Sequence, residues 1–154
     1  MTDFDLLGAQ LSALIKDEAD ALANAGNLVA LLFNALHDIN WLGIYVLRGD
    51  ELVLGPFQGQ PACVHIPVGN GVCGTAAATE KTQRVADVNA FPGHIACDPV
   101  SRSEIVVPLM IDGELRGVLD VDSPSLNRFS EADQDGIEGL CALYCELQSG
   151  KAFI

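Results

Sequence analysis

The first 38 residues repeat hydrophobic side chains at the spacing of α-helices. Residues 4–16 and residues 18–38 both place an apolar residue at about every third or fourth position. This period predicts two amphipathic helices, each with one face toward a hydrophobic core. Neither segment carries a recognisable cluster of reactive groups, so we expect both helices to serve as scaffold or as a dimer surface.

From residue 41 the hydrophobic period shortens to that of β-strands. In the first segment, the aliphatic residues at 42, 44 and 46 share one face of the expected strand, while Trp41 and Tyr45 share the other. The pattern predicts strands at residues 41–47, 51–57, 62–68 and 83–88, and a short helix at residues 72–79.

Residues 104–123 predict an antiparallel hairpin whose register determines where its acidic side chains point. A two-residue turn would mix acidic and apolar residues on both faces, because a one-residue slip moves every side chain to the other face. A three-residue loop at residues 111–113 separates them. This register places Glu104 opposite Asp120, and it puts both of them with Asp122 on the face opposite the large apolar residues.

The last segment begins with the capping pattern SEAD at residues 130–133 and continues as a helix to about residue 148. Together the elements predict an α+β fold with about six mostly antiparallel strands. Long helices would cover one face of the sheet, and loops and short helices would cover a pocket on the other. We expect one domain over residues 1–154, with the N-terminal helices at 1–38 and the sheet, pocket and last helix at 41–148.

The composition narrows the classes of partner. Eight basic residues face 21 acidic ones, for a net charge of −13, and such a surface repels nucleic acids and anionic lipids. The sequence lacks the apolar run of about 18 residues that a transmembrane helix needs. Its acidic N-terminus does not have the basic start of a signal peptide. We therefore expect a cytoplasmic protein with neither a nucleic acid nor a membrane as partner.

The chain has five cysteines, an odd number that does not suggest a structural disulfide framework. In a reducing compartment, a disulfide among them would be transient and catalytic, or redox-sensing. Cys63, Cys73 and Cys97 lie near loops around the expected pocket, and Cys97 follows a loop rich in glycine and proline, where reactive groups often lie. Cys141 and Cys145 lie on the last helix, where we interpret them as buried packing residues.

Four side chains on the pocket face of the predicted sheet suggest a binding site. Acidic residues are rarely buried unless they are paired or functional. In a closed site, Glu104, Asp120 and Asp122 would have raised pKa values and would supply both a proton donor and anions for an ammonium group. The alternative is an ordinary solvated sheet face. Trp41 would provide an aromatic wall for an S-methyl or other apolar group, or it would be an ordinary packing residue.

A zinc site is the alternative to redox chemistry at these cysteines. Cys63, His65, His94 and Cys97 offer two thiolates and two imidazoles, but their spacing matches no common zinc signature. We therefore expect a site without a metal or an organic cofactor. His94 and Arg102 are the cations nearest to Cys97 in the sequence. Either they lower the pKa of its thiol, or a protonated acid tolerates the thiolate.

Seven short motifs follow one another along the second part of the chain. They are GPFQG at 55–59, AC at 62–63, GVCG at 71–74, DV at 87–88, FPGHIACD at 91–98, SEIVVP at 103–108 and GVLDVDSP at 117–124. Their order and content resemble those of the free methionine-R-sulfoxide reductases, which are GAF-domain enzymes. The resemblance implies a GAF fold and the reduction of the R-sulfoxide of free L-methionine, as opposed to peptide-bound residues.

The resemblance also implies roles for the cysteines. Cys97 would attack the sulfoxide and become a sulfenic acid, which condenses readily with a second thiol. Cys63 would be that second thiol, so that a Cys63–Cys97 disulfide forms. Cys73 would be a third redox cysteine, and thioredoxin or a similar dithiol protein would reduce the disulfide by exchange.

The same resemblance implies that Glu104, Asp120 and Asp122 bind the substrate and that Trp41 forms its aromatic wall. The N-terminal helices match no motif, and a homodimer is among the assemblies we expect. GAF domains also bind small ligands and regulate attached effectors. A small-molecule or redox sensor without turnover is therefore the alternative function.

Overall fold

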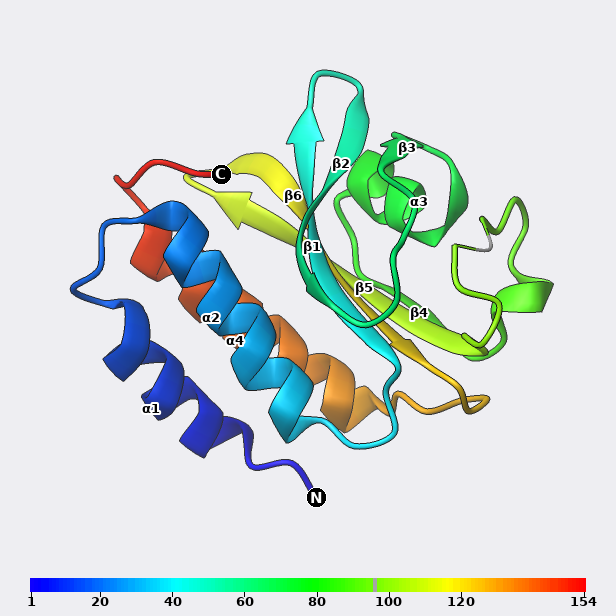
Figure 1. The fold of residues 1–154 in the computed structure, drawn as a ribbon, viewed down its shortest axis with the longest axis horizontal. Helices are drawn as coiled ribbons and strands as arrows, with labels where there is room; N and C mark the ends of the chain where they lie inside the picture. Colours follow the sequence, from blue (N-terminus) through cyan, green and yellow to red (C-terminus); the bar gives the residue numbers. More distant parts are fainter. Residues whose placement is uncertain (96) are drawn as a thin grey trace.

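A computed structural model describes residues 1–95 and 97–154 of the chain. Ala96, which belongs to the motif at 91–98, lies outside the described residues. The core of the molecule is a six-stranded sheet in the order β3-β2-β1-β6-β5-β4, and every pairing in it is antiparallel (Figure 1). The strands are β1 (Trp41–Arg48), β2 (Glu51–Gln58), β3 (His65–Pro67), β4 (Gln83–Val85), β5 (Ser103–Ile111) and β6 (Glu114–Ser123).

Three helices cover one face of this sheet, as the sequence predicts. They are α1 (Phe4–Ile15), α2 (Ala21–Ala35) and α4 (Glu131–Gln148). Figure 1 shows α2 and α4 against the sheet, with α1 outside them. Their apolar faces meet aliphatic residues of β1, β5 and β6 in the larger of the two hydrophobic cores. Among the described residues, no helix has the length and apolar character that crossing a membrane requires.

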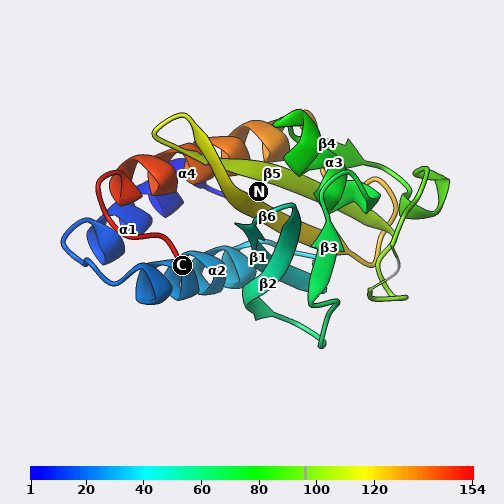
Figure 2. The same ribbon diagram turned by 90° about the horizontal axis from the view of Figure 1, so that it is seen from above.

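The opposite face carries shorter elements and loops. Helix α3 (Gly71–Thr79) lies on this side, as Figure 2 shows from a second direction, and the 3-10 turn η1 (Val88–Ala90) follows β4 in the chain. A smaller core forms there around Trp41 and Tyr45 of β1. The predicted division of β1 is confirmed, because Leu42 and Ile44 belong to the helix-side core. The α+β class and the layering are confirmed as well.

The predicted register of the β5–β6 hairpin is wrong, although the predicted faces are right. Asp112 and Gly113 form a two-residue turn, and both have positive φ angles, of 53° and 79°. The extra residue needed to restore the alternation is not in the turn but in a bulge on β6. The bulge lies opposite Leu109 and Met110 of β5, where the register shifts. As a result Glu104 pairs with Asp122 and not with Asp120.

Two predicted strands are shorter than expected. The strand predicted at 62–68 contains only the three residues of β3, because that is the length that pairs with β2. The strand predicted at 83–88 ends at Val85 and is followed by η1. Both are edge strands, and their short length limits pairing with other chains.

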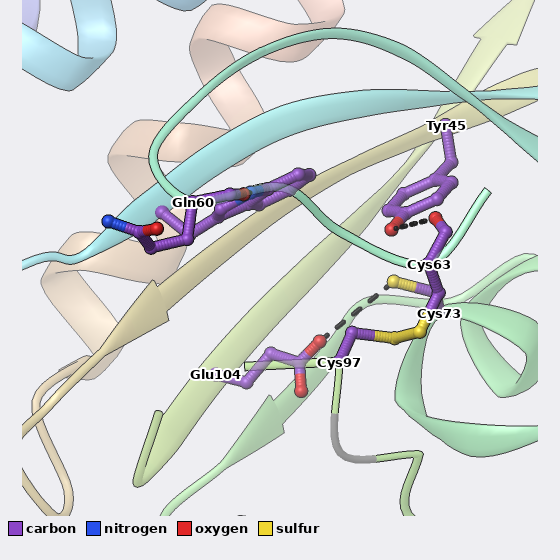
Figure 3. The surroundings of a disulfide bond; sticks show 7 residues. Tyr45, Gln60, Cys63, Cys73, Cys97 and Glu104 are labelled. Carbon is purple, nitrogen blue, oxygen red and sulfur yellow. Dashed lines mark hydrogen bonds between the residues drawn. A yellow bond between two sulfur atoms is a disulfide. The ribbon is translucent and has the colours of Figure 1, made fainter. Parts of the chain in front are cut away.

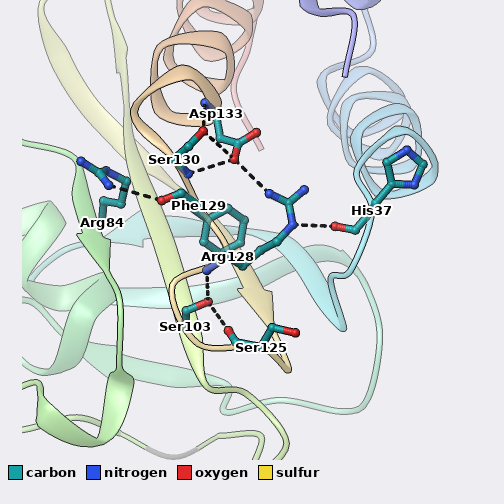
Figure 4. A network of polar contacts seen from close by, with 8 residues as sticks. All are labelled: His37, Arg84, Ser103, Ser125, Arg128, Phe129, Ser130 and Asp133. Carbon is teal, nitrogen blue, oxygen red and sulfur yellow. Dashed lines mark hydrogen bonds and ion pairs between the residues drawn. The ribbon is translucent and has the colours of Figure 1, made fainter. Parts of the chain in front are cut away.

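A polar network fixes the beginning of α4 to the beginning of β5 (Figure 4). The Ser103 hydroxyl donates to the Ser125 carbonyl and accepts from the backbone N–H of Arg128. The Arg128 guanidinium donates to the His37 carbonyl and forms a 2.9 Å ion pair with Asp133. Asp133 and Ser130 complete the predicted capping box. Because β5 begins at Ser103, this network anchors the point where the Cys97 segment enters the sheet.

Candidate active site

A pocket lies between the sheet and the elements on its α3 side. Its floor is formed by side chains of β1, β5 and β6, and its walls by the start of α3 and the segment before β5. The residues that line it are Trp41, Tyr45, Ala62, Ile66, Asn70, Gly71, Val72, Cys73, His94, Ile95, Cys97, Asp98, Ser101, Glu104, Asp120 and Asp122. The structure therefore brings together the predicted site residues, with Cys63 adjoining them through its bond to Cys97.

Cys63 and Cys97 form a disulfide at the edge of this pocket (Figure 3). Cys63 comes from the segment between β2 and β3, and Cys97 from the segment between η1 and β5. The two residues are 34 positions apart in the sequence, and their Cα atoms are 5.4 Å apart. The pairing is the one that the family resemblance implied.

Cys73 is the third cysteine of the site and is a free, buried thiol in the first turn of α3. Its Sγ contacts Oε1 of Glu104 at 3.9 Å. Burial raises the pKa of the Cys73 thiol well above its ordinary value, and the charges of Asp120 and Glu104 raise it further. The neutral thiol is therefore the stable form of Cys73 at neutral pH.

The three acidic residues line the pocket floor and are buried. Glu104, Asp120 and Asp122 are only 6%, 5% and 9% exposed. The direct pairing of Glu104 with Asp122 and the alternation along β6 bring their side chains to the same face. The solvated sheet face, which was the alternative interpretation, is therefore wrong.

Burial raises the pKa of all three carboxyl groups. For Glu104 and Asp122 the rise is large, and the neighbouring charge of Asp120 adds to it. The pKa of Asp120 rises to about 6, because hydrogen bonds from Glu104 and Cys73 partly offset its burial. Burial thus shifts the pKa values of Glu104 and Asp122 in the direction that a proton donor near neutral pH requires. The Oδ1 atom of Asp120 has no hydrogen-bond partner within the described part of the chain.

An aromatic wall faces the acids. The Trp41 ring stacks on Phe57 and Tyr45, at centroid distances of 5.4 and 5.8 Å. Gly43 makes room for this arrangement, since a Cβ atom there would lie 2.5 Å from both the Trp41 ring and Cβ of Phe57. The wall leaves a flat apolar surface beside the carboxyl groups, which suits a ligand with an apolar end and a cationic end.

Side chains of β1 hold the Cys63 segment, and the residue just before β1 holds the Cys97 segment. The Trp41 indole N–H donates to the Gln60 carbonyl at 3.0 Å, and the Tyr45 hydroxyl donates to the Cys63 carbonyl at 2.9 Å. Immediately before β1, the Asn40 amide donates to Asp98 and to Ser101, both at 3.0 Å.

The surroundings of Cys97 favour one of the two routes considered for its activation. Arg102 is exposed. His94 lines the pocket, but burial lowers the pKa of its imidazole below the ordinary value. A neutral imidazole supplies no positive charge, so His94 does not lower the pKa of Cys97 by attraction at neutral pH. Protonated acids beside the thiolate are the remaining route, and the raised pKa of Glu104 fits it.

The four side chains considered for zinc are not arranged as one site. Cys63 and Cys97 are bonded to each other, and His65 lies on the surface, 3.0 Å from Glu51. A different trio of ligand types does meet in the described residues. Donor atoms of Cys73, Glu104 and Asp120 lie within 4.8 Å of one another, and they belong to the pocket already described.

The sequence alone missed several residues of the site. Tyr45 was recognised as aromatic but not as a hydrogen-bond donor to the Cys63 segment, and Asn40 was not singled out. Asn70 and Ser101 were missed as lining residues. For Asn40, the one available signal was its position directly before the strand that begins with Trp41. That position could have indicated that Asn40 contacts the site. A polar residue at the end of a central strand often faces a site.

The chain matches the family model of the GAF domain over residues 17–144. It is 52% identical to the free methionine-R-sulfoxide reductase of Escherichia coli over 136 residues, which cover 88% of this chain and 82% of the relative. The range matched by the family model includes the sheet, the pocket and α2.

Solved structures agree with the sequence comparison. The structure of fRMsr of Staphylococcus aureus in its reduced form superposes with a TM-score of 0.94, with 49% sequence identity and 97% of each chain covered. The free methionine-R-sulfoxide reductase from Neisseria meningitidis, solved in complex with its substrate, gives a TM-score of 0.89 at 44% identity, covering 94% of this chain and 87% of that one.

Proposed function

Since the chain belongs to the GAF-domain family of free methionine-R-sulfoxide reductases, we propose that it reduces free L-methionine-R-sulfoxide to methionine through Cys97. The observation that carries this proposal is the Cys63–Cys97 disulfide at the edge of a pocket floored by three buried carboxyl groups. That arrangement joins a redox-active sulfur pair to a proton source. It also provides a place for an ammonium group.

The pocket suits the two ends of the substrate. Asp120, whose carboxyl group ionises at the lowest pH of the three, binds the ammonium group of the free amino acid. A peptide nitrogen carries no such charge, so the acids favour the free amino acid. The S-methyl group lies against Trp41. These placements bring the sulfoxide sulfur toward Cys97, which also lines the pocket.

The reaction transfers one oxygen atom. The Cys97 thiolate attacks the sulfoxide sulfur, and a neutral carboxyl group protonates the oxygen, which is otherwise a very poor leaving group. Glu104 is the favoured donor because burial raises the pKa of its carboxyl group and its Oε1 atom lies 3.9 Å from Sγ of Cys73, in the same pocket as Cys97 (Figure 3). The hydroxyl group then moves from the substrate sulfur to the Cys97 sulfur as the bond between the two sulfur atoms breaks. The substrate sulfur keeps the electron pair of that bond, methionine leaves, and Cys97 becomes a sulfenic acid.

Cys63 completes the cycle. Its thiol attacks the sulfenic sulfur of Cys97, which forms the disulfide and releases water. A dithiol protein such as thioredoxin then reduces the bond by two exchange steps in a reducing cytoplasm. No organic cofactor or metal takes part in these steps.

The test is turnover of free methionine-R-sulfoxide with dithiothreitol, measured by mass spectrometry of the methionine formed. Cys97→Ser should fall to the rate without enzyme, whereas Cys141→Ser, which alters a cysteine in the helix-side core, should keep its activity. Undiminished turnover by Cys97→Ser would exclude it as the nucleophile. Binding of the sulfoxide without any methionine, in the wild type, would favour the sensor function instead.

Cys63→Ser tests the resolving role. This variant should release about one equivalent of methionine per chain in the absence of reductant, because the first step does not need Cys63. It should fail to turn over repeatedly with thioredoxin as reductant. Normal recycling would instead assign the resolving role to Cys73, the other free thiol of the pocket.

A further inference from the structure

The two segments that carry the redox cysteines are both loops, yet they must meet again in every catalytic cycle. Cys63 lies between β2 and β3, and Cys97 between η1 and β5. When the disulfide is reduced, the covalent link between the segments is lost. The sulfenic acid on Cys97 must then meet Cys63 before a competing thiol or oxidant reaches it. Something other than the disulfide has to hold the two sulfur atoms in register.

Strand β1 is suited to this task because it is one of the most rigidly held elements in the fold. It pairs with β2 on one side and with β6 on the other. Its first six residues are all buried. The backbone N–H of Asn40, just before the strand, also donates to the Asp122 carbonyl at 2.9 Å. A side chain on β1 therefore keeps its position when a neighbouring loop moves.

Strand β1 and the residue before it contact both cysteine segments. The Tyr45 hydroxyl donates to the carbonyl of Cys63 itself, and the neighbouring strand β2 binds the next carbonyl, that of Val64, through the backbone N–H of Leu54. On the other segment, the Asn40 amide binds Asp98, the residue that follows Cys97, and Ser101. None of these contacts involves a sulfur atom, so the chemistry of the disulfide does not consume them.

We propose that β1 positions the two redox cysteines for each other, with the Tyr45 hydroxyl holding the Cys63 segment and the Asn40 amide holding the Cys97 segment. Both residues are positioning residues and take no part in bond making. The proposal rests on the proposed function, because it assumes that Cys97 carries the sulfenic acid and that Cys63 resolves it. It adds the reason why Cys63 reacts before the buried Cys73 thiol does.

Tyr45→Phe tests the first contact, because it removes the hydroxyl and keeps the ring. Reduced protein is mixed with one equivalent of free methionine-R-sulfoxide and no reductant. Released methionine and the Cys63–Cys97 disulfide are then followed in the same quenched samples. Loss of the hydrogen bond should lower the ratio of the disulfide-closure rate to the methionine-release rate by about tenfold. Dimedone should trap more sulfenic acid on Cys97 than it does in the wild type.

Tyr144→Phe is the matched control. Tyr144 is fully buried in the helix-side core, and its hydroxyl has no partner within residues 1–95 and 97–154. Its removal should leave the ratio at the wild-type value. A merely structural role of Tyr45 would slow release and closure together and leave the ratio unchanged, and that result would overturn the proposal. If the wild type itself released no methionine, the proposed function would fail instead.

An exchange of donor and acceptor tests the second contact. Asn40→Asp sets a carboxylate against Asp98 and should slow methionine release about tenfold. The double variant Asn40→Asp with Asp98→Asn restores the pair, because the new amide donates to the new carboxylate and the Ser101 hydroxyl can donate to it as well. The double variant should recover most of the release rate. If it is as slow as Asn40→Asp alone, Asn40 does not act by holding the Cys97 segment.

Discussion

The two faces of the sheet are built from the same strands and use their side chains in opposite ways. On β6, Leu119 and Val121 are fully buried against the helices, whereas Asp120 and Asp122, which alternate with them, line the pocket. One residue stabilises the fold and the next serves the site. Because successive side chains of a β-strand point to opposite faces, one short stretch of chain can pack against the helices and also line the pocket.

The pocket face costs stability that the helix face must offset. Three carboxyl groups are buried there, and the ion pairs found among the described residues involve none of them. Burying ionisable groups without cationic partners is unfavourable, and it raises the pKa values of these carboxyl groups. The same burial gives the site its proton donors, so the reactivity of one face depends on the apolar packing of the other.

The largest effect should come from breaking the helix face. Leu119→Ala removes a fully buried side chain from the core beneath α2 and α4. The free energy of unfolding should fall by about 2–5 kcal/mol, as measured by urea denaturation of the reduced protein. Turnover at low temperature should stay close to that of the wild type, because the pocket side chains are untouched. A variant that is stable but inactive would contradict this separation of duties.

Glu104→Gln should have the opposite result, with lower turnover and unchanged or higher stability. It removes a proton donor and should lower turnover by about a hundredfold or more, while the amide relieves the cost of a buried acid. Stability at pH 8 should be equal or higher by about 1 kcal/mol. Turnover and urea denaturation of the same preparation measure both. If Asp122→Asn loses activity and Glu104→Gln does not, Asp122 is the proton donor.

The smallest effect is the pH dependence of stability. The folded pKa of Asp120 is about 6, above the value of about 4 in an unfolded chain. The stabilising contribution of a group with a raised pKa is fully present below the unfolded pKa and is lost as the pH rises through the folded value. Between pH 4 and pH 8, Asp120→Asn should therefore lose about 2 kcal/mol less stability than the wild type.

The sequence predicted the layers of the fold and the faces of the strands, because burial imposes a visible period on the side chains. It did not predict the hairpin register. A two-residue turn with a bulge on β6 and a three-residue loop without one both place Glu104, Asp120 and Asp122 on one face. The side-chain pattern is the same in both cases, so only the backbone geometry distinguishes them.

The site shows a similar limit. Reactive and acidic residues could be predicted because their chemistry is unusual for their position in a strand. The contacts of Asn40 and Tyr45 could not, because each is made to a loop that is distant in the sequence. Such contacts leave no periodic signal. The low pKa of His94 was also out of reach, since it follows from burial in a loop with no regular pattern.

The Cys63–Cys97 bond closes a ring of chain that contains β3, α3, β4 and η1, and therefore most of the walls of the pocket. Under the proposed function, the Cys97 sulfur is part of the disulfide whenever the ring is closed, so it cannot attack the sulfoxide. The enzyme then accepts only its reductant, and once the ring is open it accepts only the sulfoxide. Substrate and reductant are handled in strict alternation, which is the order of events known as ping-pong kinetics. The state of the ring, closed or open, therefore records whether the enzyme last reacted with the sulfoxide or with the reductant.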